Sequence, residues 1–395
     1  MVSYAYEQAA AKRERVIEKQ IKRYAKGYQR RLRKLVKTSS RLGDLLYSFP
    51  AAAFAVVSGY GDHNRRGEAV GLVKDGADLR TVAKALELPT WTRRLPPEAF
   101  SEPLGNLPDS EAFNRKIANF IPKDPVATAM WLNWLQAARA GCHEDFALWL
   151  ARQDIYSSDL PPGVVGLGGA PILPLATFAW FSGHEDEPAR RLMERPWRRN
   201  MRIGTAVDYM IGWFDRLLLD LTRAEQRRGP GRYSKRKGGA NRYNLVPLVT
   251  SRELIEEGEA MDHCVATYAS AVAQGQCRIY SVRRGGRRIA TLELRWPNHR
   301  RDQPVINQLL GPSNVCVDRD VYLAVRDWLT HNQHLLGAPT VAGLQDQLDE
   351  TRWRSFWQTY IAEKGDRAAV KVRPDGYLVA RMCRDVDTLA RCVRA

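Results

Sequence analysis

The sequence predicts an α+β protein: a mostly helical N-terminal half, then a small α+β domain with an antiparallel three-stranded meander. Two observations support this prediction. Apolar residues recur at helical spacing up to about residue 225, and after residue 276 the period changes to two around Gly285-Gly286. The chain has 395 residues, of which 44% are hydrophobic, so it is long enough for two or three domains.

Residues 1–42 are predicted to form a basic amphipathic helix. Its apolar stripe has intervals of three or four residues and consists of Ile17, Ile21, Tyr24, Tyr28, Leu32 and Leu35. Gly27 weakens such a helix by about 1 kcal/mol relative to alanine but need not end it. We expect the stripe to dock on the next domain or on a partner.

Residues 43–225 are predicted to form a helical, Trp-rich domain. Expected helices include Asp78–Leu88, Ala127–Ala140 and Glu144–Gln153, and the tryptophans at helical spacing are expected in the core. A helix-turn-helix over 78–100 is disfavoured, because Pro96-Pro97 leave the second helix too short to read DNA.

Residues 226–243 are predicted to form a basic Gly/Pro linker, 244–336 an α+β core, and 337–395 a C-terminal α/β appendage. The core should open with a capping box formed by Thr250 and Glu253. Its expected elements are a helix to Met261, a helix Val265–Gln274 ended by Gly275, strands Cys277–Arg284, Arg288–Trp296 and Val305–Leu310, and a helix Asp318–Asn332. In the appendage we expect two helices, a hairpin of Val370–Val372 and Tyr377–Arg381, and a last short helix.

The positive charge is concentrated in two short segments. Residues 1–41 and 226–242 together account for the whole formal excess of +17. Concentrated positive charge binds phosphate and releases its counterions, so both segments are candidate nucleic-acid contacts. The candidate residues are Lys12, Arg13, Lys19, Lys22, Arg23, Arg30, Arg31, Arg33, Lys34, Arg227, Arg228, Arg232, Lys235, Arg236 and Lys237. A solubilising tail with a flexible linker, or attachment to an anionic membrane, are the alternatives.

The cysteine pattern favours a reduced, cytoplasmic protein. Six cysteines occur without a CxxC pair or a secretory signal, and the apolar run 45–57 is too short to span a membrane. No metal or other cofactor is expected. A zinc site formed by His263 or Cys264 with Cys277 and Cys316 matches no known spacing of zinc ligands. A two-metal site on Glu256, Glu257 and Glu293 is disfavoured against the interpretation that the adjacent glutamates are ordinary exposed helix residues.

His263, Cys264 and Tyr268 are the first candidate catalytic residues. Adjacent side chains diverge, so His263 and Cys264 cannot form a catalytic pair by themselves. Cys264 precedes a predicted helix, and Tyr268 follows one turn later. Either these residues line a pocket, or Cys264 is a buried, inert thiol under the sheet; we expect the latter.

Arg283, Glu293 and Gln308 complete the candidate pocket. Each lies near the middle of its predicted strand, so all three can share one face of the sheet, with Ser281 and Thr291. A face this polar is either a buried Arg283–Glu293 ion pair or a ligand-binding surface beside His263, and we favour the ligand.

The ordered motifs between Leu245 and Asn314 resemble the PcfJ-like family, named for an accessory protein of a conjugative plasmid. They are Leu254-Ile-Glu-Glu-Gly258, His263-Cys-Val-x-x-Tyr268, Ile279-Tyr-Ser-Val-Arg283, Thr291-Leu-Glu293 and Gln308-Leu-Leu-Gly-Pro-Ser-Asn314. The resemblance implies a DNA-binding relaxosome accessory of a bacterial mobile element, working in conjugation with a relaxase or other DNA-processing partner. The alternative is an enzyme with its pocket in the PcfJ-like core; whether the chain is an enzyme stays open.

Overall fold

The structure is a computed structural model that describes residues 2–105, 107–153, 172–222, 243–297, 303–336 and 348–374. The chain divides into two compact units. The first comprises the described residues of Met1–Trp180 and Trp197–Val207, and the second those of Phe181–Pro196 and Asp208–Cys383. No helix in the described part of the chain is both long and apolar enough to cross a membrane.

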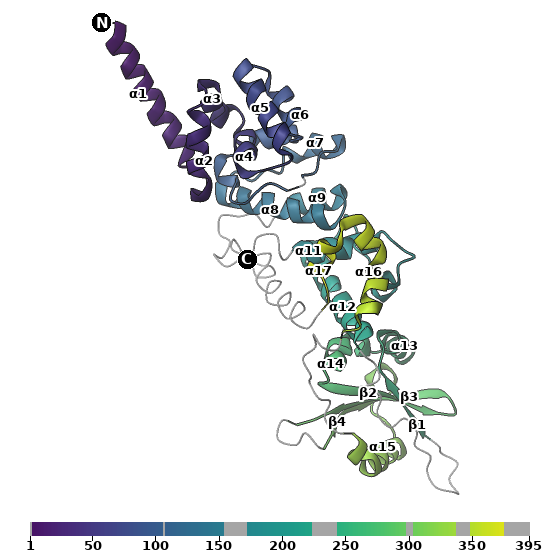
Figure 1. Ribbon diagram of the computed structural model, residues 1–395. Helices are drawn as coiled ribbons and strands as arrows, with labels where there is room; N and C mark the ends of the chain where they lie inside the picture. Colours follow the sequence, from purple (N-terminus) through teal and green to yellow (C-terminus); the bar gives the residue numbers. More distant parts are fainter. Residues whose placement is uncertain are drawn as a thin grey trace. The chain divides into compact units, whose positions relative to one another are not determined.

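The first unit is helical (Figure 1). Its elements are α1 (Val2–Ile21), α2 (Lys26–Val36), α3 (Ser40–Ser48), α4 (Pro50–Ser58), α5 (His63–Asp75), α6 (Leu79–Ala85), the 3-10 turns η1 (Thr90–Arg94) and η2 (Pro97–Ala99), α7 (Glu111–Ile117), α8 (Pro125–Gly141) and α9 (Glu144–Ala151). Helices α11 (Ile172–Ser182) and α12 (Ile203–Leu221) each contain a boundary between the units. The segment after Pro89 is a 3-10 turn, consistent with the disfavoured helix-turn-helix.

The prediction of one continuous helix over residues 1–42 is wrong, because the chain leaves helical geometry at Ala25 (φ −54°, ψ 136°). The Gln29 side chain donates a hydrogen bond to the carbonyl of Tyr24 (2.9 Å), in the turn that joins α1 to α2. The break lets Tyr24 and Leu32 both reach the interior, where the ring of Tyr24 stacks on Phe54. The apolar stripe therefore docks on neighbouring helices of its own unit.

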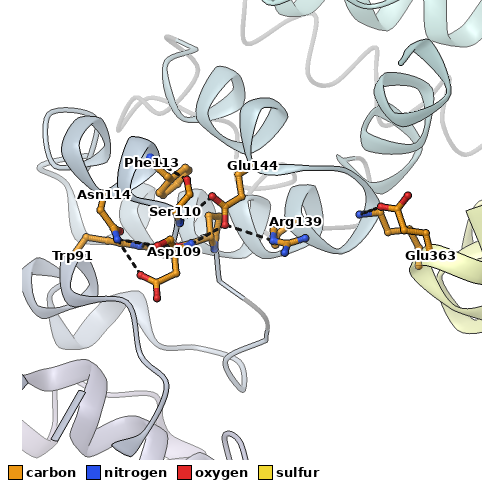
Figure 2. A network of polar contacts seen from close by, with 10 residues as sticks. Trp91, Asp109, Ser110, Phe113, Asn114, Arg139, Glu144 and Glu363 are labelled. Carbon is orange, nitrogen blue, oxygen red and sulfur yellow. Dashed lines mark hydrogen bonds and ion pairs between the residues drawn. The ribbon is translucent and has the colours of Figure 1, made fainter. Parts of the chain in front are cut away.

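A polar network ties α9 to the start of α7 (Figure 2). The Glu144 carboxylate accepts hydrogen bonds from the backbone amides of Asp109 (2.8 Å) and Ser110 (3.0 Å). Burial opposes ionisation of Glu144, but these hydrogen bonds and the charge of Arg139 hold its pKa below the usual value. The Glu144 carboxylate therefore has a structural role at the start of α7.

The second unit contains the sheet. In chain order it holds η3 (Pro188–Leu192), β1 (Tyr243–Leu248), α13 (Ser251–Met261), η5 (Cys264–Tyr268), α14 (Ala269–Ala273), β2 (Cys277–Arg284), β3 (Arg287–Arg295), β4 (Val305–Leu310), η6 (Pro312–Asn314), α15 (Arg319–Asn332), η7 (Gln333–Leu335), α16 (Glu350–Lys364) and α17 (Asp366–Lys371). The strands form one antiparallel sheet in the order β1-β2-β3-β4. The α+β class is therefore confirmed.

The predicted three-stranded meander has a fourth strand, β1, which among the described residues pairs only with β2. Pro247 lacks an amide hydrogen, and a strand at the edge of a sheet tolerates that loss because one of its sides does not need a partner strand. The two-residue turn is confirmed, since Gly285 (φ 58°) and Gly286 (φ 82°) both adopt positive φ. The capping box of Thr250 and Glu253 is also present.

Two further predictions need correction. The expected helix Val265–Gln274 is a 3-10 turn, η5, followed by the short helix α14. The expected strand Val370–Val372 is wrong, because α17 covers Asp366–Lys371 and ends there. The second strand of that hairpin, the last short helix and the linker 226–242 lie outside the described residues.

The division into compact units falls inside α12, not at the predicted linker. The C-terminal half of α12 holds the start of α13: the backbone amide of Ser251 donates to Asp220 (2.7 Å), and its hydroxyl donates to the carbonyl of Arg216 (2.7 Å). The predicted domain limits 43–225, 226–243, 244–336 and 337–395 stay predictions. The C-terminal half of α12 therefore supports α13 within the second unit.

Candidate active site on the polar face of the sheet

The two faces of the sheet differ sharply in polarity. One face carries Tyr280, Val282 and Leu292, which form an apolar core with Val325 and Trp328 of α15. The other face carries polar residues and is covered by α13 and α14 (Figure 1). Register places Ser281 opposite Thr291, Ile279 opposite Glu293, and Gln308 opposite Glu293, so these side chains share that face.

A chain of hydrogen bonds crosses this polar face and ends at His263. Arg288 Nε donates to Glu257 Oε2 (2.8 Å), Thr291 Oγ1 donates to Glu257 Oε1 (3.0 Å), and His263 Nε2 lies 2.8 Å from Thr291 Oγ1. The Glu257 side chain is 0% exposed and ion-paired with Arg288, so its carboxylate only accepts. The Thr291 hydroxyl therefore donates its proton to Glu257 and accepts from His263. In the neutral imidazole this geometry places the proton on Nε2 and the lone pair on Nδ1.

The backbone around His263 is held by a close approach and a left-handed residue. Asp262 ends α13 with φ 53°, and its carboxylate accepts a hydrogen bond from the Ser313 hydroxyl (2.8 Å). Gly258 lies so close to the next turn that a Cβ there would meet the His263 carbonyl oxygen at 2.9 Å. The position of His263 thus depends on glycine at 258.

Glu293 forms a second polar centre on the same face. Its side chain is 3% exposed and binds the guanidinium of Arg295 and the amide of Asn307 (2.7 Å). Burial, reinforced by the charge of Glu293, raises the pKa of the Cys277 thiol to about 12. The same two causes, in the same order, raise the pKa of Tyr268. Both groups therefore stay protonated at neutral pH.

A small pocket, with a cavity volume of about 40 Å³ and partly open to solvent, brings five of the six candidate residues together. Those five are His263, Cys264, Tyr268, Glu293 and Gln308. The Tyr268 hydroxyl makes only a long contact, 3.5 Å, with the Gln308 carbonyl oxygen. What these residues do stays a proposal, but the predicted grouping corresponds to one surface cavity.

Two expectations about the candidates are wrong. Cys264 is exposed, and it is Cys277 that is buried under the helices. Arg283 does not line the pocket and does not pair with Glu293; its Nε donates to Ser281 (3.0 Å) instead. The reason is register, since Arg283 lies opposite Arg288 near the turn and Glu293 lies at the other end of the hairpin.

Sequence reasoning missed the roles of Glu257 and Thr291, which orient His263. For Glu257, the spacing of residues in the sequence already indicated a buried position. Glu257 follows Leu254 by three residues and precedes Met261 by four, so it lies on the buried face of α13. A carboxylate on an apolar helix face needs a partner inside the fold.

The carboxylates considered for a two-metal site do not converge. Glu256 pairs with Arg252, Glu257 with Arg288, and Glu293 with Arg295. Across the described ranges, no three His, Cys, Asp or Glu side chains are grouped so as to hold a metal ion.

The N-terminal candidate contacts for nucleic acid divide into two groups. Three arginines are engaged within the fold, in the ion pairs Arg13–Asp44, Arg23–Glu98 and Arg33–Glu18, and Arg31 donates to the carbonyl of Val57. The remaining five are exposed on α1 and α2 or just after α1: Lys12, Lys19, Lys22, Arg30 and Lys34. The six candidates between Arg227 and Lys237 lie outside the described residues.

Comparison with known proteins gives a family match for part of the chain. Residues 223–314 match the family described as PcfJ-like protein, whereas no curated protein and no solved structure matches the chain. The matched segment contains every residue that lines the pocket, together with Glu257 and Arg288. The resemblance to the PcfJ-like family is thus confirmed for residues 223–314, the part of the chain that carries the candidate site.

Proposed function

We propose that this protein is a nucleic-acid-binding enzyme of a mobile element, with its active site in the PcfJ-like core and its attachment to nucleic acid through basic segments. The mobile-element context, including a relaxase or other DNA-processing partner in conjugation, rests on the family match alone. The catalytic part rests on one observation, the hydrogen-bond chain that runs from Glu257 through Thr291 to His263 at the edge of a pocket.

This series of hydrogen bonds is the arrangement expected around a histidine that acts as a general base. Catalytic histidines act in one tautomer, and a third group holds the ring by accepting the proton of its other nitrogen. Here Thr291 takes that place and Glu257, neutralised by Arg288, fixes the direction of the Thr291 hydroxyl. His263 then takes a proton at Nδ1. Tyr268, whose pKa is raised by burial and by Glu293, is available as the proton donor.

Two measurements test the catalytic proposal: the tautomer of His263 and the turnover of candidate substrates. In ¹⁵N-labelled protein, the imidazole spectra should show His263 as the Nε2–H tautomer, and Thr291→Val should abolish that preference. In parallel, purified protein is incubated with nucleosides, nucleotides and short oligonucleotides, and products are followed by mass spectrometry. Turnover that His263→Asn loses, with His331→Asn as the exposed control, supports the proposal. His263 in the other tautomer, or no turnover of any of these probes, refutes it.

A second observation favours the binding part independently. The five exposed cations on and beside α1 and α2 lie close together in sequence with no acid after Glu18 in this segment. Each phosphate contact contributes a slope of about −0.9 in log K against log salt for duplex DNA. Replacing Lys19, Lys22 and Lys34 by Gln should flatten the slope by up to about 2.7.

The matched control changes three exposed lysines elsewhere in the same unit, Lys84, Lys116 and Lys123, to Gln. It removes the same charge and should leave the slope nearly unchanged. Equal flattening by both triple variants would mean that net charge, not the helical segment, drives binding. No binding of DNA or RNA at low salt would refute attachment altogether.

A further inference from the structure

The walls of the pocket restrict the class of molecule that fits it. This step rests on the proposed catalytic role of the same site. Among the described residues that line the cavity, none is a lysine or an arginine. A phosphate or carboxylate group inside the pocket would therefore lack a cationic partner, and burying an unpaired anion is unfavourable. The part of the ligand that enters is not anionic.

A cationic group is also disfavoured, because the one carboxylate in the pocket is already neutralised. Glu293 is ion-paired with Arg295 through one oxygen and accepts from Asn307 through the other. Its remaining lone pairs still accept hydrogen bonds, but its charge is compensated. The entering group is consequently neutral and polar.

The cavity combines apolar surface with a few side-chain hydrogen-bonding groups. Val265, Ile279 and Leu310 supply the apolar surface, and Tyr268 adds an aromatic ring. The cavity is small, about 40 Å³, well below the usual range for small-molecule sites, and the pocket is partly open to solvent, so only part of a ligand enters it. These properties fit a flat ring that enters by one edge better than an extended chain.

Two carboxamides complete the lining, Gln308 and Asn314. Gln308 is exposed, and its carbonyl oxygen holds only the 3.5 Å contact from Tyr268, so a ligand can displace that contact at little cost. A glutamine or asparagine side chain pairs with adenine through two hydrogen bonds, donating to N7 and accepting from the N6 amino group. A carboxylate such as Glu293 accepts from amino groups as well.

We propose that the pocket binds an adenine base, read by the carboxamide of Gln308, with the sugar and phosphate remaining outside. Enzymes that act on bases take the target out of the stack into such a pocket, and unpaired bases enter at the lowest cost. The sugar–phosphate backbone of such a strand suits the basic segments. Free adenine nucleotide and an unpaired strand present the same chemistry, and the experiment separates them.

The experiment measures binding of adenosine, guanosine, cytidine and uridine by calorimetry to the full-length protein. Adenosine should bind tightest, and Gln308→Leu should weaken adenosine by about tenfold or more, the range expected for a bidentate base contact. The control Gln303→Leu, an exposed glutamine outside the pocket, should stay within about twofold. Tighter binding of oligo(dA) than of AMP at low salt identifies a strand as the source; equal binding identifies the free nucleotide.

Several results would overturn the assignment. Equal affinity for all four nucleosides, or no effect of Gln308→Leu, removes the adenine assignment. Preferential binding of arginine or lysine methyl ester, weakened by Gln308→Leu, would identify a pocket for a cationic side chain. If no nucleoside binds while His263 shows the Nε2–H tautomer and His263-dependent turnover, adenine recognition is wrong and the catalytic proposal stands. Adenosine binding without that tautomer would support adenine recognition and refute the catalytic proposal.

Discussion

Gly258→Ala is the sharpest structural test of the site, because it changes one methyl group beside the catalytic candidate. The added Cβ would lie 2.9 Å from the carbonyl oxygen of His263 and 3.6 Å from Cγ1 of Val265. Backbone oxygen cannot rotate away as a flexible side chain does. We therefore expect the His263 segment to move by several tenths of an ångström, which lengthens the His263–Thr291 hydrogen bond.

Two opposing contributions determine how much Gly258→Ala changes the free energy of unfolding. Alanine is favoured over glycine in a helix by about 1 kcal/mol. Overpacking a tight site costs about 1–3 kcal/mol. Their sum predicts a net loss of about 1 kcal/mol for Gly258→Ala. Gly212→Ala in α12, where a Cβ would meet nothing within 4 Å, should instead gain about 1 kcal/mol.

The assay compares thermal unfolding of the two alanine variants and the ¹⁵N imidazole spectrum of His263. A difference of about 2 kcal/mol corresponds to roughly 4–8 °C between the variants for a unit of this size. His263 should lose its single tautomer in Gly258→Ala and keep it in Gly212→Ala. Equal stabilisation by both substitutions, with an unchanged His263 spectrum, would refute the close approach at residue 258.

Three other predictions concern the second unit. Iodoacetamide should label exposed Cys264 in the native protein and buried Cys277 only after denaturation, as mass spectrometry of the labelled peptides will show; early labelling of Cys277 would contradict its burial. Burial raises the pKa of Asp215 to about 6. Its protonated form therefore contributes at most about 3 kcal/mol to the free energy of unfolding at low pH, and this contribution is lost as the pH rises from about 4 through 6. Asp215→Asn should therefore stabilise the protein at pH 7.5 but not at pH 4 in paired thermal melts, and an equal effect at both values would contradict the shift. Gly286→Ala should cost about 1–2 kcal/mol in chemical denaturation, because φ is +82° there while nothing lies within 4 Å; Gly286→Asn should cost less.

Local chemistry explains which parts of the core were predictable. The capping box of Thr250 and Glu253 and the turn at Gly285-Gly286 are set by neighbouring residues, so sequence alone located them. The bounds of β2 and β4 follow from the period of two. The strand β1 was not predicted, because a proline such as Pro247 indicates a break in a strand unless that strand is known to lie at the edge of a sheet.

The Arg283–Glu293 ion pair, which was the less favoured alternative, shows how strand register decides what strand periodicity cannot. Period two places both residues on one face but says nothing about their separation along the hairpin. A two-residue turn at Gly285-Gly286 sets Arg284 opposite Arg287, and therefore Arg283 opposite Arg288. Glu293 then lies several residue pairs away, opposite Ile279 after a bulge. The turn alone was sufficient to exclude the ion pair, whereas the bulge was not predictable.

The two faces of the sheet provide an internal comparison for the origin of the polar site. Against α15 the sheet is sealed with apolar residues such as Leu292 and Trp328, which shows that this backbone supports an ordinary core. On the face that α13 covers, the same strands bury Thr291, which bonds Glu257, and Glu293, although apolar residues of similar volume are often as stabilising as buried ion pairs or more so. Stability alone therefore does not account for the polar face. The buried carboxylates make sense as supports for groups at the pocket: Glu257 orients His263, and Glu293 stays a compensated acceptor within the pocket wall.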